Sequence, residues 1–313
     1  MADDGERMGT YNGHLGTVWD LDPSWCSTFL ITAGADQKVM LWEVETGDDL
    51  LTYEHGGPVR SVAFNEIANK FVSCNDNFSD NPPSINIYEF NSTDPMSSSR
   101  EPLKQFKLEM SCKATRVCWV NYRNQLDGGI LVTLEDGRIQ ILDPETGDVL
   151  EEEKVHSKQV KRISMNKDKT LLFTASEDCT GKMLDADTLE TLITYETDRP
   201  VNAIVPHPTK DHVLLGGGQD AMSVTTTSGR VGKFECRFFE RIYNTEIGRV
   251  KGHFGPINAI AINPDGRSYA SGAEDGYIRL HHFDQAYIEM KDPVPEEEIK
   301  DGKGDNSTEL GRA

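Results

Sequence analysis

A histidine and an aspartate recur at an almost fixed separation along this chain. The four pairs are His14 and Asp36, His55 and Asp76, His156 and Asp178, and His253 and Asp275, separated by 22, 21, 22 and 22 residues. A catalytic site needs one copy of its residues, whereas a pattern that recurs along a chain belongs to a repeated fold unit. The spacing therefore predicts a chain built from repeats.

The length of the repeat indicates which fold it forms. The aspartates and their equivalents stand at positions 36, 76, 136, 178, 220 and 275, with separations of 40, 60, 42, 42 and 55 residues. This period matches the WD repeat of about 40–45 residues, in which each copy supplies the four strands of one propeller blade. We expect an all-β fold, a WD-repeat β-propeller with six visible repeats, over residues 1–290.

Short β-rich runs and two insertions support this fold class. The runs at 59–63, 71–73, 171–175 and 268–272 are typical of strands, and no helical period persists between residues 11 and 290. The two long separations place insertions at 75–100 and 216–246. Residues 291–313 carry seven acids against four bases and few large apolar residues, so we expect a disordered acidic tail.

The charge of the chain limits its partners. A formal net charge of −20 and a pI near 4.8 disfavour direct binding of nucleic acid or of an anionic membrane, because such binding depends on Lys and Arg that neutralise phosphates. A positively charged peptide is the favoured partner.

Compartment and redox signals predict a cytoplasmic protein. No apolar run approaches the 18 residues of a membrane span, and the first ten residues are too polar for a secretory signal. The six cysteines include no Cys-x-x-Cys pair, so neither a zinc site nor a disulfide framework is indicated.

The repeated residues superficially resemble a hydrolytic triad. His14, Thr32 and Asp36 are the residue types of such a site. Because the arrangement recurs, we predict structural tetrads instead, in which the histidine donates to the aspartate and the hydroxyl and the Trp42 indole extend the network. The same role is expected of His55 with Asp76, His156 with Asp178, and His253 with Asp275.

Other motifs predict no catalytic residue, no cofactor and no metal. The triple glycine at 216–218 lacks the Lys-Ser/Thr of a P-loop, so we expect it to form a tight turn where strands meet near the axis. His281 and His282 are neighbours on an expected strand, so their side chains point to opposite faces and cannot chelate one ion.

The second insertion holds the candidate partner-binding residues. Its phenylalanines and arginine are either core residues or an interface hot spot, and the sequence leaves both alternatives open. The candidates are Gln219, Asp220, Thr225, Lys233, Phe234, Arg237, Phe238 and Phe239.

Four long strings carry a resemblance to a known family. They are Leu-Gly-Gly-Gly-Gln-Asp-Ala-Met-Ser-Val-Thr-Thr-Thr at 215–227, Gly-Lys-Phe-Glu-Cys-Arg-Phe-Phe at 232–239, Gly-Arg-Val-Lys-Gly-His-Phe-Gly-Pro-Ile-Asn at 248–258 and Ser-Gly-Ala-Glu-Asp-Gly-Tyr-Ile-Arg-Leu-His-His-Phe-Asp at 271–284. These strings resemble the i subunit of eukaryotic translation initiation factor 3.

The resemblance implies a function that the residues alone do not reveal. It implies a non-catalytic propeller that docks the C-terminal region of the b subunit and an N-terminal segment of the g subunit, near the small ribosomal subunit but without reading RNA. The alternative is a WD-repeat adaptor in receptor signalling or ubiquitin ligation.

The chain departs from the family pattern in three ways. Family members carry about forty residues, close to one repeat, before the point where this chain starts, and their ring has seven blades. Ser223 stands where family members carry an acid, and the stretch after residue 290 is longer than usual.

Closure of the ring is the main physical problem, because an open propeller exposes unpaired strand edges. Residues 6–11 resemble the outer strand that precedes each Gly-His. We expect them to pair with the last repeat's strand at 277–283, with residues 285–290 as the competing candidate for that position.

Overall fold

The computed structural model describes residues 9–110, 113–218 and 234–290. The chain divides into two compact units, residues 1–282 and residues 283–313. All strands of the described residues lie in the first unit. The expected acidic tail at 291–313 lies outside the described residues.

In the described part of the chain the strands form six antiparallel sheets, each made of consecutive strands. The first three sheets are β1 (Val18–Pro23), β2 (Phe29–Gly34), β3 (Lys38–Glu43) and β4 (Asp49–Glu54); β5 (Val59–Phe64), β6 (Lys70–Asn75), β7 (Ser84–Glu89) and β8 (Lys104–Lys107); and β9 (Ala114–Tyr122), β10 (Gln125–Leu134), β11 (Arg138–Leu142) and β12 (Val149–Lys154). A 3-10 helix, η1 (Pro95–Ser97), lies between β7 and β8.

The other three sheets repeat the same order, but the last has one strand fewer. They are β13 (Val160–Met165), β14 (Leu171–Ser176), β15 (Thr180–Asp185) and β16 (Thr191–Glu196); β17 (Val201–Pro206), β18 (His212–Gly217), β19 (Glu235–Glu240) and β20 (Glu246–Lys251); and β21 (Ile257–Ile262), β22 (Ser268–Ala273) and β23 (Ile278–His282).

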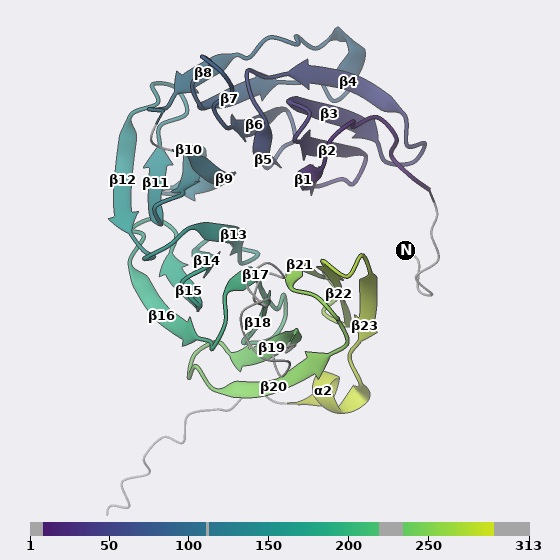
Figure 1. Cartoon of the computed structure of the whole chain (residues 1–313), viewed down its shortest axis with the longest axis vertical. Helices are drawn as coiled ribbons and strands as arrows, with labels where there is room; N and C mark the ends of the chain where they lie inside the picture. The colour runs from purple at the N-terminus through teal and green to yellow at the C-terminus, as the bar shows by residue number, and fades with distance from the viewer. Residues whose placement is uncertain (1–8, 111–112, 219–233, 291–313) are drawn as a thin grey trace, which may run out of the picture. The chain divides into compact units, whose positions relative to one another are not determined.

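The sheets stand around a common axis in chain order, with the first strand of each sheet innermost (Figure 1). This is the six-bladed arrangement predicted from the repeats, so the all-β propeller class is confirmed. The four β-rich runs lie in β5, β6, β14 and β22 as expected. Residues 84–89 form β7 inside the first insertion.

The hydrophobic core is a series of layers between neighbouring sheets. In the first layer, Val39 and Leu41 of β3 pack against Val59 and Val62 of β5. Similar layers join the second sheet to the third, the third to the fourth, and the fourth to the fifth. Each buried Val, Leu or Ile contributes about 1.5–3 kcal/mol relative to an exposed one. A sheet is therefore stable only beside its neighbours.

A glycine allows the fifth and sixth sheets to pack closely together. A Cβ on Gly216 of β18 would come within 3 Å of the Ile257 and Ile260 side chains of the sixth sheet. The expectation of a turn for the glycines at 216–218 therefore needs a correction, because two of them are strand residues and Gly216 serves close packing between sheets.

An ion cluster on the inner strands ties distant sheets together. Asp20 of β1 lies 2.9 Å from Arg116 of β9 and 2.8 Å from Arg162 of β13, and the Ser61 hydroxyl of β5 donates to it over 2.6 Å. Burial raises the pKa of Asp20, but the two guanidinium groups more than offset this and hold it below its usual value. One carboxylate thus links four sheets.

The expected strand at the N-terminus is not formed by the residues that the structure describes. Residues 9–11 are not in a strand, and residues 6–8 lie outside the described part of the chain. The Tyr11 ring instead packs on Trp42 of the first sheet, and its hydroxyl donates to the Val44 carbonyl over 3.2 Å. The prediction that this segment closes the ring on the last sheet is therefore wrong for residues 9–11.

The competing candidate for the outer strand is a helix. Residues Gln285–Glu289 form α2 in the second unit, and the Asp284 carboxylate accepts the Tyr287 backbone N–H over 2.7 Å. An aspartate that caps a free N–H favours the start of a helix, which is why these residues are helical rather than extended.

The Asp20 cluster predicts a large effect of a single substitution. Asp20→Ala leaves the buried Arg116 and its neighbour Arg162 without their counter-charge, so we expect a loss of about 3–5 kcal/mol in the free energy of unfolding. Urea denaturation followed by circular dichroism measures it. Asp136→Ala, which removes a solvent-exposed pair with Arg138, is the matched control and should cost less than about 1 kcal/mol. Equal losses in the two variants would contradict the role given to Asp20.

Candidate functional site

The first repeat assembles all four members of the predicted tetrad. The Trp42 indole N–H donates to the Thr32 hydroxyl over 2.8 Å, and Thr32 Oγ1 lies 2.7 Å from Nε2 of His14. Nδ1 of His14 lies 2.9 Å from an Asp36 oxygen. Each group can therefore donate its hydrogen bond to the next, from Trp42 to Thr32 to His14 to Asp36. This chain of bonds joins the turn before β1 to the strands behind it.

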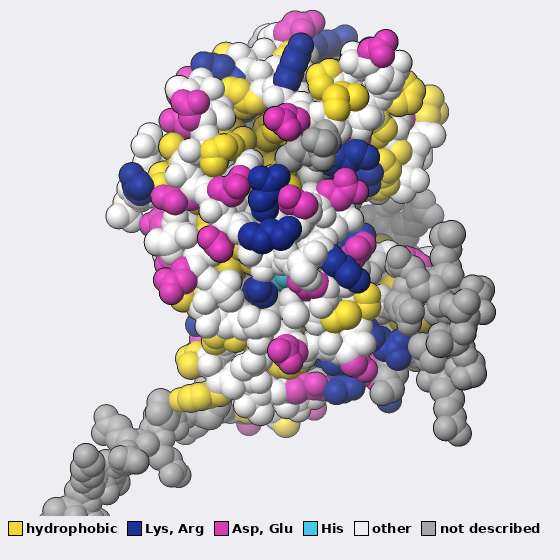
Figure 2. Space-filling model, turned by 60° about the vertical axis from the view of Figure 1, so that its left-hand side comes forward, with side chains coloured by type: hydrophobic (Ala, Val, Ile, Leu, Met, Phe, Trp, Pro, Cys, Tyr) yellow, Lys and Arg dark blue, Asp and Glu magenta, His cyan; other side chains and the backbone are white. Residues whose placement is uncertain are grey.

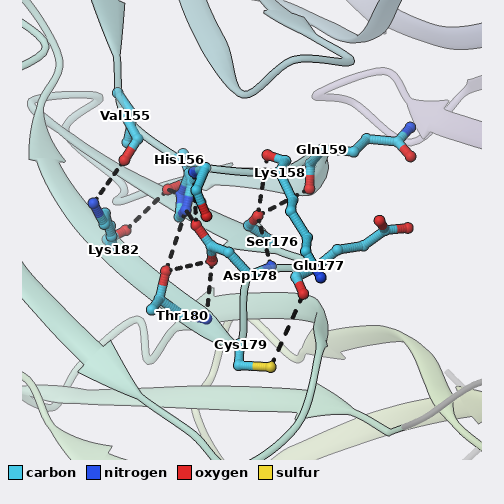
Figure 3. A network of polar contacts seen from close by, with 12 residues as sticks. Val155, His156, Lys158, Gln159, Ser176, Glu177, Asp178, Cys179, Thr180 and Lys182 are labelled. Carbon is cyan, nitrogen blue, oxygen red and sulfur yellow. Dashed lines mark hydrogen bonds and ion pairs between the residues drawn. The ribbon is translucent and has the colours of Figure 1, made fainter.

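The fourth repeat builds the same network without the tryptophan, because Leu184 stands at the position of Trp42 (Figure 3). Asp178 lies 3.0 Å from Nδ1 of His156, and Nε2 of His156 lies 2.8 Å from the Thr174 hydroxyl. Thr180 also donates to Asp178, over 2.6 Å. Burial opposes ionisation, but the bonds from His156 and Thr180 outweigh it and hold the pKa of Asp178 well below its usual range.

The sixth repeat is similar, with a histidine at the position of the tryptophan. Nδ1 of His253 lies 3.0 Å from Asp275, and its Nε2 lies 2.8 Å from the Ser271 hydroxyl. Ser271 in turn lies 3.3 Å from Nε2 of His281. The Phe254 backbone N–H, with further bonds from Tyr277 and His253, lowers the pKa of Asp275 to about 2.

The second repeat differs from the prediction. Nδ1 of His55 lies 3.2 Å from the Tyr53 carbonyl and its Nε2 lies 2.8 Å from the Ser73 hydroxyl. Asp76 instead accepts Nε of Arg60 over 2.7 Å. The reason is the insertion that begins here: β6 continues to Asn75, so Asp76 starts a longer connection to β7 and no longer sits in a tight turn. Burial lowers the pKa of His55 to about 4.

The two remaining aspartate positions form no tetrad that the structure describes. Asp136 pairs with Arg138, two residues further along the chain, over 2.7 Å. Asp220 lies in the segment 219–233, outside the described residues. The bonds among histidine, hydroxyl and aspartate are therefore present in the first, fourth and sixth sheets, and the pattern is degenerate in the second and third.

The geometry of the tetrads favours a structural role over catalysis. A hydroxyl, an imidazole and a carboxylate are in line, as in a hydrolytic triad. However, the side chains of Thr32, Thr174 and Ser271 are buried. The Thr32 oxygen also already accepts a hydrogen bond from Trp42. A nucleophile must reach a substrate. Within the described residues, no group of three or more His, Cys, Asp or Glu side chains could hold a metal ion.

The candidate partner-binding residues fall into three classes. Gln219, Asp220, Thr225 and Lys233 lie outside the described residues. Phe238 and Phe239 are buried in the core, Phe239 against Tyr195 and Phe238 against Tyr269. Their side chains are thus unavailable to a partner, and for these two the core alternative holds.

The remaining two candidates lie on the third strand of the fifth sheet, β19, and directly before it. Arg237 makes an ion pair with Asp198. Phe234 lies against Gly218, where a Cβ would come within 3 Å of its ring. Neither is a freely projecting side chain.

Sequence reasoning missed a polar pocket at the inner strands. It has a volume of about 310 Å³, and its lining includes Trp19, Arg60, Arg116, Lys161, Asn202 and Asn258, from all six sheets. Arg60 stacks on the Trp19 ring at 4.4 Å. The cations are already paired within the chain, Arg60 with Asp76, Arg116 with Asp20 and Lys161 with Glu177, so the pocket offers little excess positive charge to a phosphate.

The surface agrees with this picture. On the face shown in Figure 2, Lys and Arg side chains are interspersed with Asp and Glu side chains and small apolar patches. Nucleic-acid binding requires a continuous basic patch or stripe. No such stripe crosses this face. Within the described residues, no helix has the length and hydrophobicity needed to cross a membrane.

Comparison with known proteins gives the family. The EIF3I family model matches residues 1–292. The chain belongs to this family.

Curated relatives agree with that assignment. The eukaryotic translation initiation factor 3 subunit I of Nematostella vectensis is 45% identical over 287 residues, which cover 92% of this chain and 86% of the relative. The proteins of the same name from Bombyx mori and Homo sapiens are 43% and 41% identical over 285 and 287 residues, and the matches cover 85% and 86% of their lengths. The family resemblance in the four strings is thereby confirmed.

The tetrads predict unequal effects of removing equivalent aspartates. Asp178→Ala strips the buried His156 of its acceptor, so we expect a loss of about 1–3 kcal/mol in the free energy of unfolding at pH 7. Asp76→Ala removes only a pair with the half-exposed Arg60 and should cost less than about 1 kcal/mol.

The pH dependence gives a second check. Because the pKa of Asp178 is depressed in the folded state, its contribution is present above the ordinary pKa of 3.8 and is lost as the pH falls below it. The gap between wild type and Asp178→Ala, measured by urea denaturation, should shrink below about pH 4. A larger effect for Asp76→Ala than for Asp178→Ala would contradict this account.

Proposed function

We propose that this chain is a non-catalytic scaffold subunit of the eukaryotic translation initiation factor 3 complex. It docks the b and g subunits in the cytoplasm during assembly of the preinitiation complex on the small ribosomal subunit. The observation that carries the proposal is the family match over residues 1–292, together with relatives that bear the name of this subunit.

The structure adds physical support. The triad-like residues serve the fold in three sheets, which leaves them no role in turnover. A net charge of −20 favours basic peptide segments as partners and steers them by long-range attraction. The ribosome is then reached through other subunits rather than by direct contact with RNA. The adaptor alternative gains no supporting feature from the described residues.

The candidate contact region remains the second insertion. Its described borders, at Gly218 and Phe234, lie close together beside the sixth sheet. Lys233, next in sequence to the border at Phe234, is the most useful residue to test.

Binding assays with two purified peptides test the proposal: the C-terminal region of the b subunit and the N-terminal segment of the g subunit. We expect saturable one-to-one binding by biolayer interferometry, weaker at high salt because the attraction is partly electrostatic. Lys233→Glu adds negative charge at the candidate contact region and should strengthen binding of a basic segment, whereas Lys167→Glu, at an exposed position in the turn between β13 and β14, should not. Absence of binding to both peptides by a folded chain would refute the proposed function.

A further inference from the structure

The inner strand of each described sheet carries a β-bulge at the same position. Near the start of that strand, its register with the second strand shifts by one residue in all six sheets. A bulge leaves one residue unpaired and re-aims its side chain. The residues left unpaired are Trp19, Arg60, Thr115, Lys161, Asn202 and Asn258. All six line the polar pocket of about 310 Å³ where the inner strands converge on the axis (Figure 1). We call it the axial pocket.

The bulge recurs from sheet to sheet, but the residue in it does not. The residue before each bulge is apolar in all six strands, and five of these side chains are buried. They are Val18, Val59, Ala114, Val160, Val201 and Ile257. The bulge residues instead carry an indole, a guanidinium, a hydroxyl, an ammonium and two amides. A repeated fold unit keeps similar residues where packing needs them. The bulge position is therefore free to serve a ligand.

The arginines of the axial pocket are held by acids that do not line it. Arg116 lies 2.9 Å from Asp20, and Arg60 lies 2.6 Å from Asp76. Both aspartates are buried, and neither is a lining residue of the pocket. A ligand in the pocket therefore meets the two arginines and not their counter-ions.

Both arginines keep a donor for such a ligand. Arg60 directs Nε and Nη2 to the same oxygen of Asp76, and its Nη1 donates to no group among the described residues. The Arg60 guanidinium is also fixed by stacking on the Trp19 ring at 4.4 Å. Nη1 of Arg116 is buried and lies off the direction of a hydrogen bond to Asp20. A buried donor without an acceptor is unfavourable, so an added acceptor oxygen would stabilise it.

The rest of the lining favours one negative charge. Lys161 is a third cation, and its partner Glu177 does not line the pocket either. Glu274 is the one acid among the lining residues, and its carboxylate accepts Nδ2 of Asn258 over 3.5 Å. Asn202 in turn donates to Asn258 over 2.9 Å. Three cations thus face a ligand together with one acid, and the amides can bond the polar backbone beside it.

Size and charge together limit the ligand. Pockets for small molecules have volumes of about 300–1,000 Å³, so the axial pocket is at the lower limit and suits one side chain or one chain terminus. Each of its three cations already has a counter-ion. A carboxylate with a single charge therefore fits better than a phosphate with two, and its two oxygens match the planar donors of arginine.

We propose that the axial pocket binds one carboxylate of a partner polypeptide, with Arg60 and Arg116 as its donors and Trp19 as the wall beside it. The net charge of −20 repels an acidic segment at long range. The carboxylate is therefore carried by a neutral or basic segment, either on an Asp or Glu side chain or at a C-terminus. This goes beyond the proposed function, which assigns no ligand to the axis of the propeller.

Three short peptides test the proposal and separate the two sources of the carboxylate. Each has seven residues of Gly and Lys around one central position. The first has a central Glu and both ends capped. The second has a central Gln and a free C-terminal carboxylate. The third has a central Gln and both ends capped, so that it carries no carboxylate and has the highest positive charge.

Nuclear magnetic resonance of the ¹⁵N-labelled full-length chain gives the readout. The indole N–H signal of Trp19 is assigned by its loss in Trp19→Phe. The indole N–H of Trp42, which donates to Thr32, serves as an internal reference that should not move. We expect the Trp19 signal to shift saturably with the first or the second peptide, with a dissociation constant of about 1 mM or lower. The third peptide should bind at least about tenfold more weakly.

The third peptide also excludes a non-specific attraction. Long-range attraction to an acidic protein would make the most positive peptide the strongest ligand, which is the reverse of the expected order. Arg60→Gln and Lys161→Gln should each weaken the carboxylate peptide about tenfold. Lys167→Gln, at an exposed position between β13 and β14, should leave it unchanged.

Three results would overturn the proposal. They are a Trp19 signal that neither carboxylate peptide moves, equal binding of the third peptide, and an equal loss of affinity in Lys167→Gln and Arg60→Gln. None of the peptides comes from the b or g subunit. Failure here therefore leaves the proposed function standing, and failure of the b and g assays leaves the axial pocket untouched.

Discussion

The apolar layer between consecutive sheets is the interaction on which the rest of this structure depends. A sheet of four short strands cannot bury both of its faces by itself, so each repeat gains most of its stability from its neighbours. The pairing of Val39 and Leu41 with Val59 and Val62 is the first of these layers. The same logic explains why the first and last sheets differ from the others: within the described residues each packs against a neighbouring sheet on one side only.

Polar networks set the register that these layers need. A tetrad joins the turn before a sheet to the hydroxyl and aspartate of the strands behind it, as His156, Thr174 and Asp178 do. The Asp20 carboxylate acts at longer range, because it joins sheets whose residues stand far apart in the chain. Residue types that elsewhere perform hydrolysis serve here to satisfy buried polar groups, and their recurrence in several sheets is what distinguishes the two uses.

The sequence predicted the fold more fully than the site, for identifiable reasons. The His–Asp spacing is local, so the tetrads of His14, His156 and His253 could be predicted from one repeat length. The prediction that His55 pairs with Asp76 was wrong because an insertion begins at the aspartate and changes the turn. Phe238 and Phe239 could not be assigned from sequence, since a propeller strand is buried on both faces and loses its alternation. The contact between Asp20 and Arg162 joins residues with no local relation, and no periodicity reveals it.

The central claim is that stability comes from having a neighbour on both sides, and amide hydrogen exchange of the free full-length chain tests it most directly. Exchange reports local opening, which is easiest where few apolar contacts hold a strand. The account predicts the slowest exchange for β14 and β18, whose sheets are covered on both faces, and much faster exchange for β22 and β23. Amides of β23 that exchange as slowly as those of β15 would contradict it, because they would show that the sixth sheet is stable without a sheet on its outer face.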